Sequence, residues 1–484
     1  MRKCNFISIF ILFIFVTGSL YAQPSADTTK TISKKKEKIK KGWTFGAVPA
    51  IAYDSDLGFR YGGLVNLYYF GDGSSYPRYN HSIYVEWSHT TKGSDKKTFQ
   101  IDSYTLIPGI RFTADVSYIT EQGLDFYGFN GYQSTYDDDF ISQKDNVHAF
   151  RYNASRLPPY GPNFIDTIDF SKAPYRLFYK HDRKMLRVIA DFKGRFLADH
   201  FQWLAGAGMY WLRITPIGYN KLNEGKKDGD ILLNKVYPDT SNKDNVLPGS
   251  LYERYVDWGV ISENEKDGGW TPFAKLGLIY DTRDNEPNPM KGLWTSLIFI
   301  YGHSFMDKDA NFGQVILTHR QYFTLYREVL NFAYRVDYQQ KIAGTIPFYM
   351  LPYLHATQGP PIDGMGGSQT IRGVLRNRVV GDGMAFANFE FRWKFLRTKF
   401  LKQNFYIALS AFCDMGMVID KYKIDKSLIP AGYNAFDTEK PHIGFGGGLH
   451  FALNQNFIVA VDYGLAADKR DGSSGLYIGL NFLY

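Results

Sequence analysis

Residues 385–395 read Ala385-Phe386-Ala387-Asn388-Phe389-Glu390-Phe391-Arg392-Trp393-Lys394-Phe395. Because successive residues of a β-strand point to opposite faces, these side chains sort into two rows. One row holds alanine and aromatic residues, and the other carries Asn388, Glu390, Arg392 and Lys394. A row this charged suits a wet interior rather than an apolar core. The segment is therefore typical of a transmembrane β-barrel strand that turns one face toward lipid.

The composition of the whole chain agrees with a barrel. Aromatic residues make up 17% of it, with 36 Tyr and 46 Gly, as expected where strands need aromatic girdles and tight turns. Beyond the N-terminus, no uninterrupted apolar run approaches the ~18 to 20 residues that a membrane-spanning helix requires. The sequence predicts an all-β transmembrane barrel and excludes a helical membrane protein.

Alternating segments predict about sixteen antiparallel strands, the first near 43–53 and the last near 475–484. All the long connections follow odd-numbered strands, and they are residues 122–184, 219–269, 344–382 and 420–440. In outer-membrane barrels the extracellular loops are long and the periplasmic turns are short. This parity predicts that both chain ends lie on the periplasmic side.

The N-terminal region is expected to direct export. Residues 1–22 form a predicted signal peptide, because a basic start precedes an apolar run and a plausible cleavage region. Residues 23–42 are a predicted basic periplasmic tail, and residues 43–484 are the predicted barrel. The lysine run from Lys34 to Lys41 suits contact with anionic lipid or docking to a partner, and nucleic acid is not expected in an exported chain. After the signal peptide only Cys413 remains, so no intrachain disulfide is expected.

A glycine-rich connection precedes the strand quoted first and reads Gly366-Gly367-Ser368-Gln369-Thr370-Ile371-Arg372-Gly373. Glycines here suit backbone turns that would strain other residues. An Arg in a partly wet barrel interior needs carboxylate partners, since a buried unpaired charge is costly. The alternation places Glu390 and Asp414 on the inner faces of their strands. The alternative is that Arg372 is a solvated residue of the loop and that both acids line a pore.

Four motifs between Gly277 and Tyr484 resemble the outer-membrane protein assembly factors of the BamA/TamA type, also called the bacterial surface antigen family. They are Asp281-Thr282-Arg283-Asp284, Gly366 to Gly373, Phe389-Glu390-Phe391 and Phe412-Cys413-Asp414-Met415-Gly416. In that family the extracellular loop with the Arg-Gly motif folds back into the barrel, where its Arg pairs with acidic residues of the inner wall. The resemblance implies a lumen lock formed by Ile371, Arg372 and Gly373 of the loop with Glu390 and Asp414 of the wall.

Further candidate residues lie in turns and at the C-terminus. Gly366 and Gly367 belong to the loop motif, and Asp281, Arg283 and Asp284 are expected to cap a turn. In the last strand, Phe482 and Tyr484 share the predicted lipid-facing row. The chain thus ends on an aromatic residue, which resembles the C-terminal signal of outer-membrane barrels, with Gly479, Phe482 and Tyr484 as its candidate residues.

The resemblance implies a barrel that assists insertion or translocation of proteins at the outer membrane of a Gram-negative bacterium. Lipid and unfolded outer-membrane proteins are then the expected partners. Members of that family carry periplasmic binding modules ahead of the barrel, and none is recognisable here, so a periplasmic or surface partner is expected to replace them. If the first and last strands part, the seam is formed by 43–53 and 475–484. The alternative is a passive pore or solute channel, which polar inner rows such as Arg335 and Asp337 favour.

An enzyme is not expected. Ser82 beside His81 lacks the spacing and the shared loop of a nucleophile with its base. His81 and His89 are only a loose candidate pair for a metal, and no glycine-rich phosphate loop opens a helix. We expect no catalytic residue, no metal and no cofactor.

Overall fold

The computed structural model describes residues 39–484 with some interruptions. The undescribed internal positions are 56, 77, 135, 137–178, 218–249, 287, 304–310, 328, 356–361, 401–402, 430–437, 454–456 and 481. The predicted signal peptide lies outside the described residues, as does the predicted tail up to residue 38. Residues 41–484 form one compact unit, and the description below concerns this unit.

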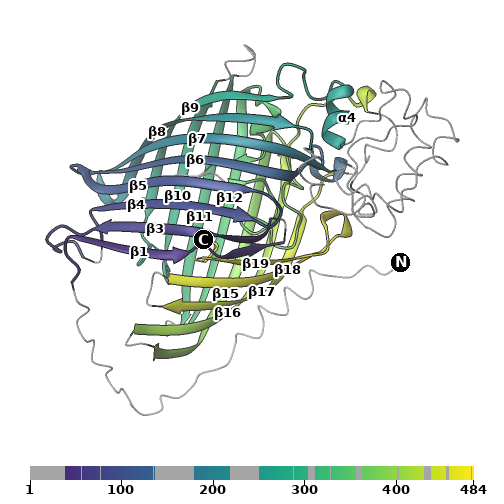
Figure 1. Cartoon of the computed structure of the whole chain (residues 1–484). Coiled ribbons are helices and arrows are strands. Elements are labelled where there is room, and N and C mark those ends of the chain that lie inside the picture. The colour runs from purple at the N-terminus through teal and green to yellow at the C-terminus, as the bar shows by residue number, and fades with distance from the viewer. Residues whose placement is uncertain are drawn as a thin grey trace. The chain divides into compact units, whose positions relative to one another are not determined.

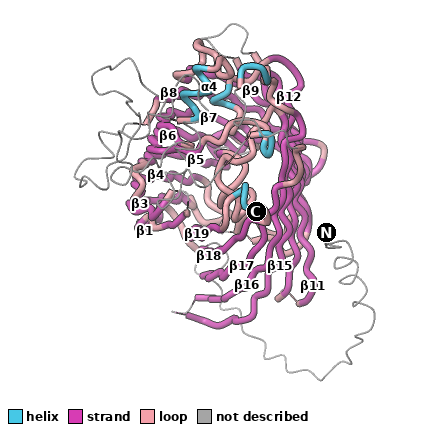
Figure 2. Tube along the Cα trace, turned by 90° about the vertical axis from the view of Figure 1, so that its right-hand side faces the viewer, coloured by secondary structure: helices cyan, strands magenta, loops and turns pink. Residues whose placement is uncertain are grey.

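Residues 41–484 form a closed antiparallel barrel of sixteen strands (Figures 1 and 2), which confirms the predicted fold. The first strand is broken into β1 and β2, and each piece pairs with β3. The wall consists, in chain order, of β1 (Trp43–Pro49), β2 (Ala52–Asp54), β3 (Gly58–Tyr69), β4 (His81–Thr90), β5 (Asp95–Ile107), β6 (Ile110–Asp125), β7 (Lys180–Phe196), β8 (Ala198–Thr215), β9 (Gly268–Asp281), β10 (Gly292–Gly302), β11 (Phe312–Tyr326), β12 (Leu330–Gly344), β15 (Gly383–Phe400), β16 (Gln403–Asp420), β17 (His442–Leu453), β18 (Phe457–Ala466) and β19 (Ser474–Leu480).

Short elements occupy the connections between the wall strands. They are η1 (Gly131–Gln133), α4 (Leu251–Asp257), η5 (Phe348–Met350), β13 (Tyr353–Leu354), β14 (Ile362–Asp363), η6 (Lys426–Leu428) and η7 (Lys469–Asp471). Ser250 caps α4, because its hydroxyl accepts the main-chain N–H of Glu253 at 3.2 Å. Within the described part of the chain, no helix combines the length and the apolar character needed to cross a membrane.

The predicted alternation holds along β15. Asn388 and Glu390 are fully buried and point into the lumen, the interior of the barrel, whereas Phe391 and Trp393 on the outer row are each 50% exposed. The same period places Asp414 of β16 inside and leaves Cys413 on the outer row. Side chains of opposite character thus line the two faces of a single wall.

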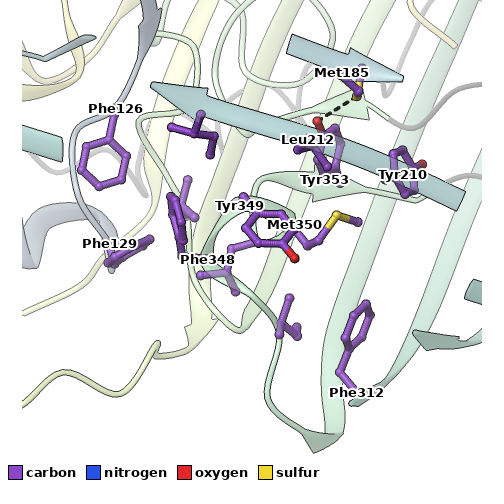
Figure 3. Packing of buried hydrophobic residues seen from close by; sticks show 14 of the residues in the cluster. Phe126, Phe129, Met185, Tyr210, Leu212, Phe312, Phe348, Tyr349, Met350 and Tyr353 are labelled. Carbon is purple, nitrogen blue, oxygen red and sulfur yellow. Dashed lines mark hydrogen bonds between the residues drawn. The ribbon is translucent and has the colours of Figure 1, made fainter. Parts of the chain in front are cut away.

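The long connections β6–β7, β8–β9, β12–β15 and β16–β17 leave the barrel at one end, because neighbouring strands run in opposite directions. We call this the long-loop end, and the opposite end the short-turn end. A large buried cluster rich in aromatic side chains, here called the aromatic cluster, packs the loops against the wall (Figure 3). It includes Phe126 and Phe129 after β6, Tyr255 on α4 and Tyr349 on η5. The cluster brings side chains from several loops together at this end of the barrel.

The barrel closes through a short seam between β19 and β2. Among the described residues, two pairs are in register there, Tyr477 with Asp54 and Ile478 with Tyr53, and Ser55 exchanges hydrogen bonds with Leu476 beside them. The last strand ends at Leu480, earlier than the predicted boundary at 484, and β1 ends at Pro49. Among the described strands, β1 has a registered partner only in β3, so residues 43–49 form an edge. Proline lacks an N–H for the ladder, which accounts for the break after β1.

Candidate functional site

The site is built around residues 364–382, the loop that leads from β14 into β15. The Thr370 hydroxyl closes its turn, since it accepts the main-chain N–H of Gly366 at 2.8 Å and donates to the Gly366 carbonyl at 3.0 Å. Gly367 donates its N–H to the Val374 carbonyl at 2.8 Å. Gly366 has φ +106°, and a Cβ there would lie 1.8 Å from the Leu375 oxygen. Glycine is required at this position for both reasons.

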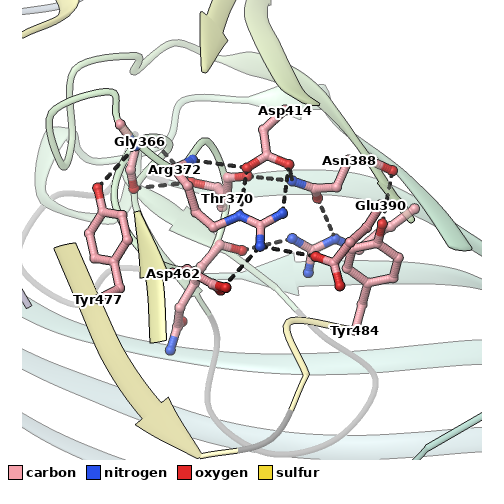
Figure 4. Close-up of polar contacts among 12 residues, drawn as sticks. Gly366, Thr370, Arg372, Asn388, Glu390, Asp414, Asp462, Tyr477 and Tyr484 are labelled. Atoms are coloured by element: carbon pink, nitrogen blue, oxygen red, sulfur yellow. Dashed lines mark hydrogen bonds and ion pairs between the residues drawn. The ribbon is translucent and has the colours of Figure 1, made fainter. Parts of the chain in front are cut away.

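Arg372 lies at the inner end of this loop and is fully buried (Figure 4). Its Nε and Nη2 donate to Asp414 at 2.8 and 3.2 Å, and its main-chain N–H reaches the same carboxylate at 3.1 Å. Its Nη1 donates to Glu390 at 3.0 Å and to Asp462 at 3.2 Å. The guanidinium carbon also lies 3.4 Å from the centre of the Phe412 ring. A planar fork of donors suits three carboxylates better than a single ammonium would.

The charges of the site explain why Arg372 stays protonated in a buried position. Burial alone lowers the pKa of Arg372, but Asp414 and Glu390 raise it well above its ordinary value. Glu390 also accepts Nε of Arg392 at 2.7 Å, so one carboxylate serves two cations. Asp462 in turn meets Nε2 of His450 at 3.0 Å. The lock is a network of alternating charges rather than a single ion pair.

Neighbouring polar groups hold the loop backbone against the wall. The Asn388 amide donates to Asp414 at 2.8 Å and to the Thr370 carbonyl at 2.5 Å. Arg335 donates to the Asn388 side chain at 2.8 Å and to the Gln369 carbonyl at 2.7 Å. These contacts join the loop to β12 and β15 as well as β16.

The opposite flank of the loop packs on wall glycines. A Cβ at Gly444 would lie 2.1 Å from the Arg372 oxygen, and one at Gly464 would lie 2.6 Å from the Arg372 carbonyl carbon. Gly373, with φ +97°, donates its N–H to the Tyr477 hydroxyl at 3.1 Å. The backbone of the loop thus approaches β17, β18 and β19 more closely than any other residue type would allow.

The structure brings together the predicted residues Arg372, Glu390 and Asp414. Ile371 is buried beside them in a small apolar cluster with Met365 and Phe386. Sequence reasoning missed Asp462 and the two wall glycines. The signal for Asp462 was available, because it is the single charged residue in the apolar strand 457–466.

The predicted turn residues lie apart from the lock. Asp281 ends β9 and holds Arg283 through contacts of 2.9 and 2.8 Å to its guanidinium. Asp284 accepts the main-chain N–H groups of Met290 at 3.0 Å and Lys291 at 3.3 Å. These residues cap the β9–β10 connection at the short-turn end, and Arg283 also stacks on Trp294.

The C-terminal aromatic residues correct one expectation. Phe482 and Tyr484 were predicted to face lipid, yet both are buried inside the barrel. The Tyr484 hydroxyl donates to the carbonyls of Ala333 at 3.1 Å and Asn388 at 3.2 Å, and Arg392 donates to the Tyr484 main-chain oxygen at 3.0 Å.

The reason for this inward position is a change of direction after β19. Alternation applies only while a strand continues, and β19 ends at Leu480, just beyond Gly479. Beyond that point the Arg392 guanidinium lies 4.3 Å from the Phe482 ring centre and 5.1 Å from the Tyr484 ring centre. These cation–π contacts favour the interior over lipid.

Residues 234–482 match the model of the Omp85 superfamily domain. Among solved structures, the chain is similar to BamA from Haemophilus ducreyi lacking POTRA domains 1–3, with 14% identity and a TM-score of 0.51 over 92% of this chain and 71% of that one. It is also similar to CdiB from Escherichia coli, with 8% identity and a TM-score of 0.49 over 92% of this chain and 63% of that one. No curated protein matches the chain in sequence. At such identities the likeness to BamA is one of fold.

Proposed function

The chain belongs to the Omp85 superfamily, and on this premise we propose that it assists the insertion or translocation of proteins at the outer membrane of a Gram-negative bacterium. The observation that carries the proposal is the seam. β19 and β2 share two registered pairs, whereas the neighbouring pair β18 and β19 shares seven. The seam is the place where the wall opens at least cost, because the fewest main-chain hydrogen bonds are lost there.

The edge of β1 is the second element of the mechanism. On the side that faces away from β3, residues 43–49 have no registered partner among the described strands, and such an edge can pair with a strand from another chain. An entering client strand would add to this edge while the barrel wall supplies the lipid boundary. Clients are therefore expected to be proteins that contribute β-strands. Both termini of this barrel are expected on the periplasmic side.

Side chains in the lumen count against the alternative of an open solute channel. The loop reaches β16 through Arg372 and β6 through Arg376, so it spans the lumen, and the aromatic cluster packs several loops together at the long-loop end. A path for solutes would have to lead past both. An insertion mechanism at the seam needs no such passage.

A reversible crosslink across the seam tests the mechanism. In a chain with Cys413→Ser, the pair Tyr53→Cys and Ile478→Cys joins β2 to β19 at a registered position. The matched control, Val461→Cys with Ile478→Cys, joins β19 to its other neighbour β18. We expect oxidation of the seam pair to abolish function and reduction to restore it, with the control pair active throughout. Full activity of the oxidised seam pair would reject opening at the seam.

Depletion in the native host tests the function itself. Folded outer-membrane barrels shift in gel mobility on heating, so they can be counted in the envelope after depletion. Selective loss of these barrels, with precursors accumulating in the periplasm, would identify the clients. An unchanged barrel population would reject the assembly role.

A further inference from the structure

A second set of contacts fixes the loop at the wall opposite the lock. Arg376, four residues after Arg372, donates from Nη2 to Oε1 of Glu121 on β6 at 2.8 Å. The other oxygen of Glu121 accepts Nε of Arg183 on β7 at 2.9 Å. Glu121 and Arg183 are buried, with 7% and 4% exposure. An ion pair this sheltered is screened much less than a surface pair.

The backbone next to Arg376 is shaped for this position. Asn377 has φ +59° and donates its side-chain amide to the carbonyl of Asp125, the last residue of β6, at 3.3 Å. Gly364 has φ +78°, a conformation that favours glycine, and a Cβ there would lie 1.6 Å from the Asn377 side-chain oxygen. A left-handed Asn and a facing Gly indicate a specified docking site rather than an incidental contact.

The rest of the network ties this contact to the aromatic cluster. Arg183 donates from Nη1 to the Tyr353 hydroxyl at 2.9 Å, and that hydroxyl donates to Met185 at 3.0 Å (Figure 3). Tyr353 belongs to the same long connection as the loop, and Met185 belongs to β7. The contact between loop and wall is therefore backed by packed side chains.

The two anchoring sites lie on opposite sides of the barrel. With β1 and β2 counted as one strand, β6 is the eighth strand from β16 in both directions around the wall. One of these two paths passes through β19 and β2, the strands of the seam. The loop therefore joins the two walls that the seam separates.

We propose that Arg376 and Glu121 are positioning residues that make the loop a strut across the lumen, and that this strut restrains opening of the seam. The inference rests on the proposed function for its biological meaning. With the Arg372 anchor alone, the loop would move with the β15–β18 wall as the seam parts. With both anchors in place, parting of the seam must break one of them or deform the loop.

The test measures the rate of disulfide crosslinking across the seam in purified barrels, where no client is needed. In the Cys413→Ser background, the chain carries either the seam pair, Tyr53→Cys with Ile478→Cys, or the control pair, Val461→Cys with Ile478→Cys. Arg376→Gln and Glu121→Gln should each raise the ratio of open to closed seam by about fivefold, the factor that corresponds to losing one hydrogen-bonded contact of modest strength. This shift is measured as a lower rate of seam crosslinking. Arg376→Lys should retain most of the rate. Arg195→Gln, in an exposed pair near the β7–β8 turn, is the matched loss of charge and should change nothing.

A double variant separates the strut from general weakening of the wall. Glu121→Gln with Arg376→Gln should slow seam crosslinking no more than Glu121→Gln alone, because both changes remove the same contact. Unchanged seam crosslinking in both single variants would overturn the strut. An equal fall in the control pair would also overturn it, since the wall would then have loosened as a whole. Neither result depends on client assembly, so failure of the strut and failure of the proposed function are distinguishable.

Discussion

Asp414 binds Arg372 through the main chain of the loop as well as through the guanidinium. One of its oxygens accepts both the Arg372 N–H at 3.1 Å and Nε at 2.8 Å. Glu390, by contrast, receives a single contact from Arg372 and also serves Arg392. The two acids are therefore not equivalent, because Asp414 fixes the path of the loop as well as the charge of its Arg.

This inequality predicts an order among lock variants. Arg372→Ala should destabilise the barrel by about 3–5 kcal/mol, because it leaves buried carboxylates without their partner. Asp414→Asn should expose the loop to protease more than Glu390→Gln does. Reversing the charge at position 390, as in Glu390→Arg, should not rescue Arg372→Glu, since Asp414 and Asp462 would still repel the new acid. The measurements are the temperature of the heat-induced mobility shift and the rate of loop cleavage.

The opposite order would contradict this account of the lock. Greater loop cleavage in Glu390→Gln than in Asp414→Asn would mean that charge alone, and not the path of the main chain, holds the loop. Arg397→Gln, an exposed position on β15, is the control for loss of a wall cation.

Alternation in the sequence was enough to place Glu390 and Asp414 on the inner wall, because period two assigns a face to every strand residue. The same argument could have placed Asp462 inside, because it is the single charged residue of an apolar strand, but it could not show that Asp462 meets Arg372. Which residues meet across a lumen depends on barrel curvature and on the depth of the loop, and neither is encoded locally. Arg372 with its two acids Glu390 and Asp414 was therefore predictable, and the wider network around them was not.

The two ends of the wall were the least predictable parts. The break after Pro49 follows from a residue without an N–H, so it could have been anticipated. The inward turn after Leu480 could not, because the pattern through Phe482 and Tyr484 continues to alternate. Arg392, from a distant strand, supplies the contacts that favour the interior.

Substitution of a wall glycine beside the loop is expected to have a steric effect. Gly444→Ala should destabilise the docked loop by about 1–3 kcal/mol, because the new methyl group would meet the main-chain oxygen of Arg372. Gly479→Ala is the matched control, since a Cβ there meets nothing within 4 Å. Protease protection of the loop measures the difference. Equal protection in the two variants would mean that the loop does not depend on close packing against β17.

The C-terminal segment should leave the lumen when Arg392 loses its charge. In a chain with Cys413→Ser and Leu483→Cys, Arg392→Gln is expected to raise the labelling rate by a water-soluble maleimide about tenfold, through loss of two cation–π contacts and a hydrogen bond. Arg392→Lys should raise the rate less. A rate unchanged by Arg392→Gln would show that the segment is held by packing alone.

Acidification should destabilise the loop segment that holds His355 at the long-loop end, through protonation of this residue. This residue lies in the connection after β13, and its main-chain N–H donates to the Gln339 side chain at 3.0 Å. Burial, with a smaller effect of Lys275, lowers the pKa of its ring from 6.5 to about 3. The folded ring stays neutral over the range in which an unfolded ring takes up a proton. Its contribution to stability is therefore complete above pH 6.5 and is lost as the pH falls from 6.5 toward 3.

The size of the effect follows from the same difference in pKa. Between pH 7 and pH 5 the free energy of unfolding this segment should fall by about 2 kcal/mol, since each pH unit below the unfolded pKa contributes about 1.4 kcal/mol. Proteolysis of the long-loop end at the two pH values, with a protease active at both, measures this change. His355→Phe should abolish this component, whereas His200→Phe, at an exposed position on β8, should retain it. A His355→Phe protein with the full acid sensitivity of the parent would show that other groups of the long-loop end take up the proton.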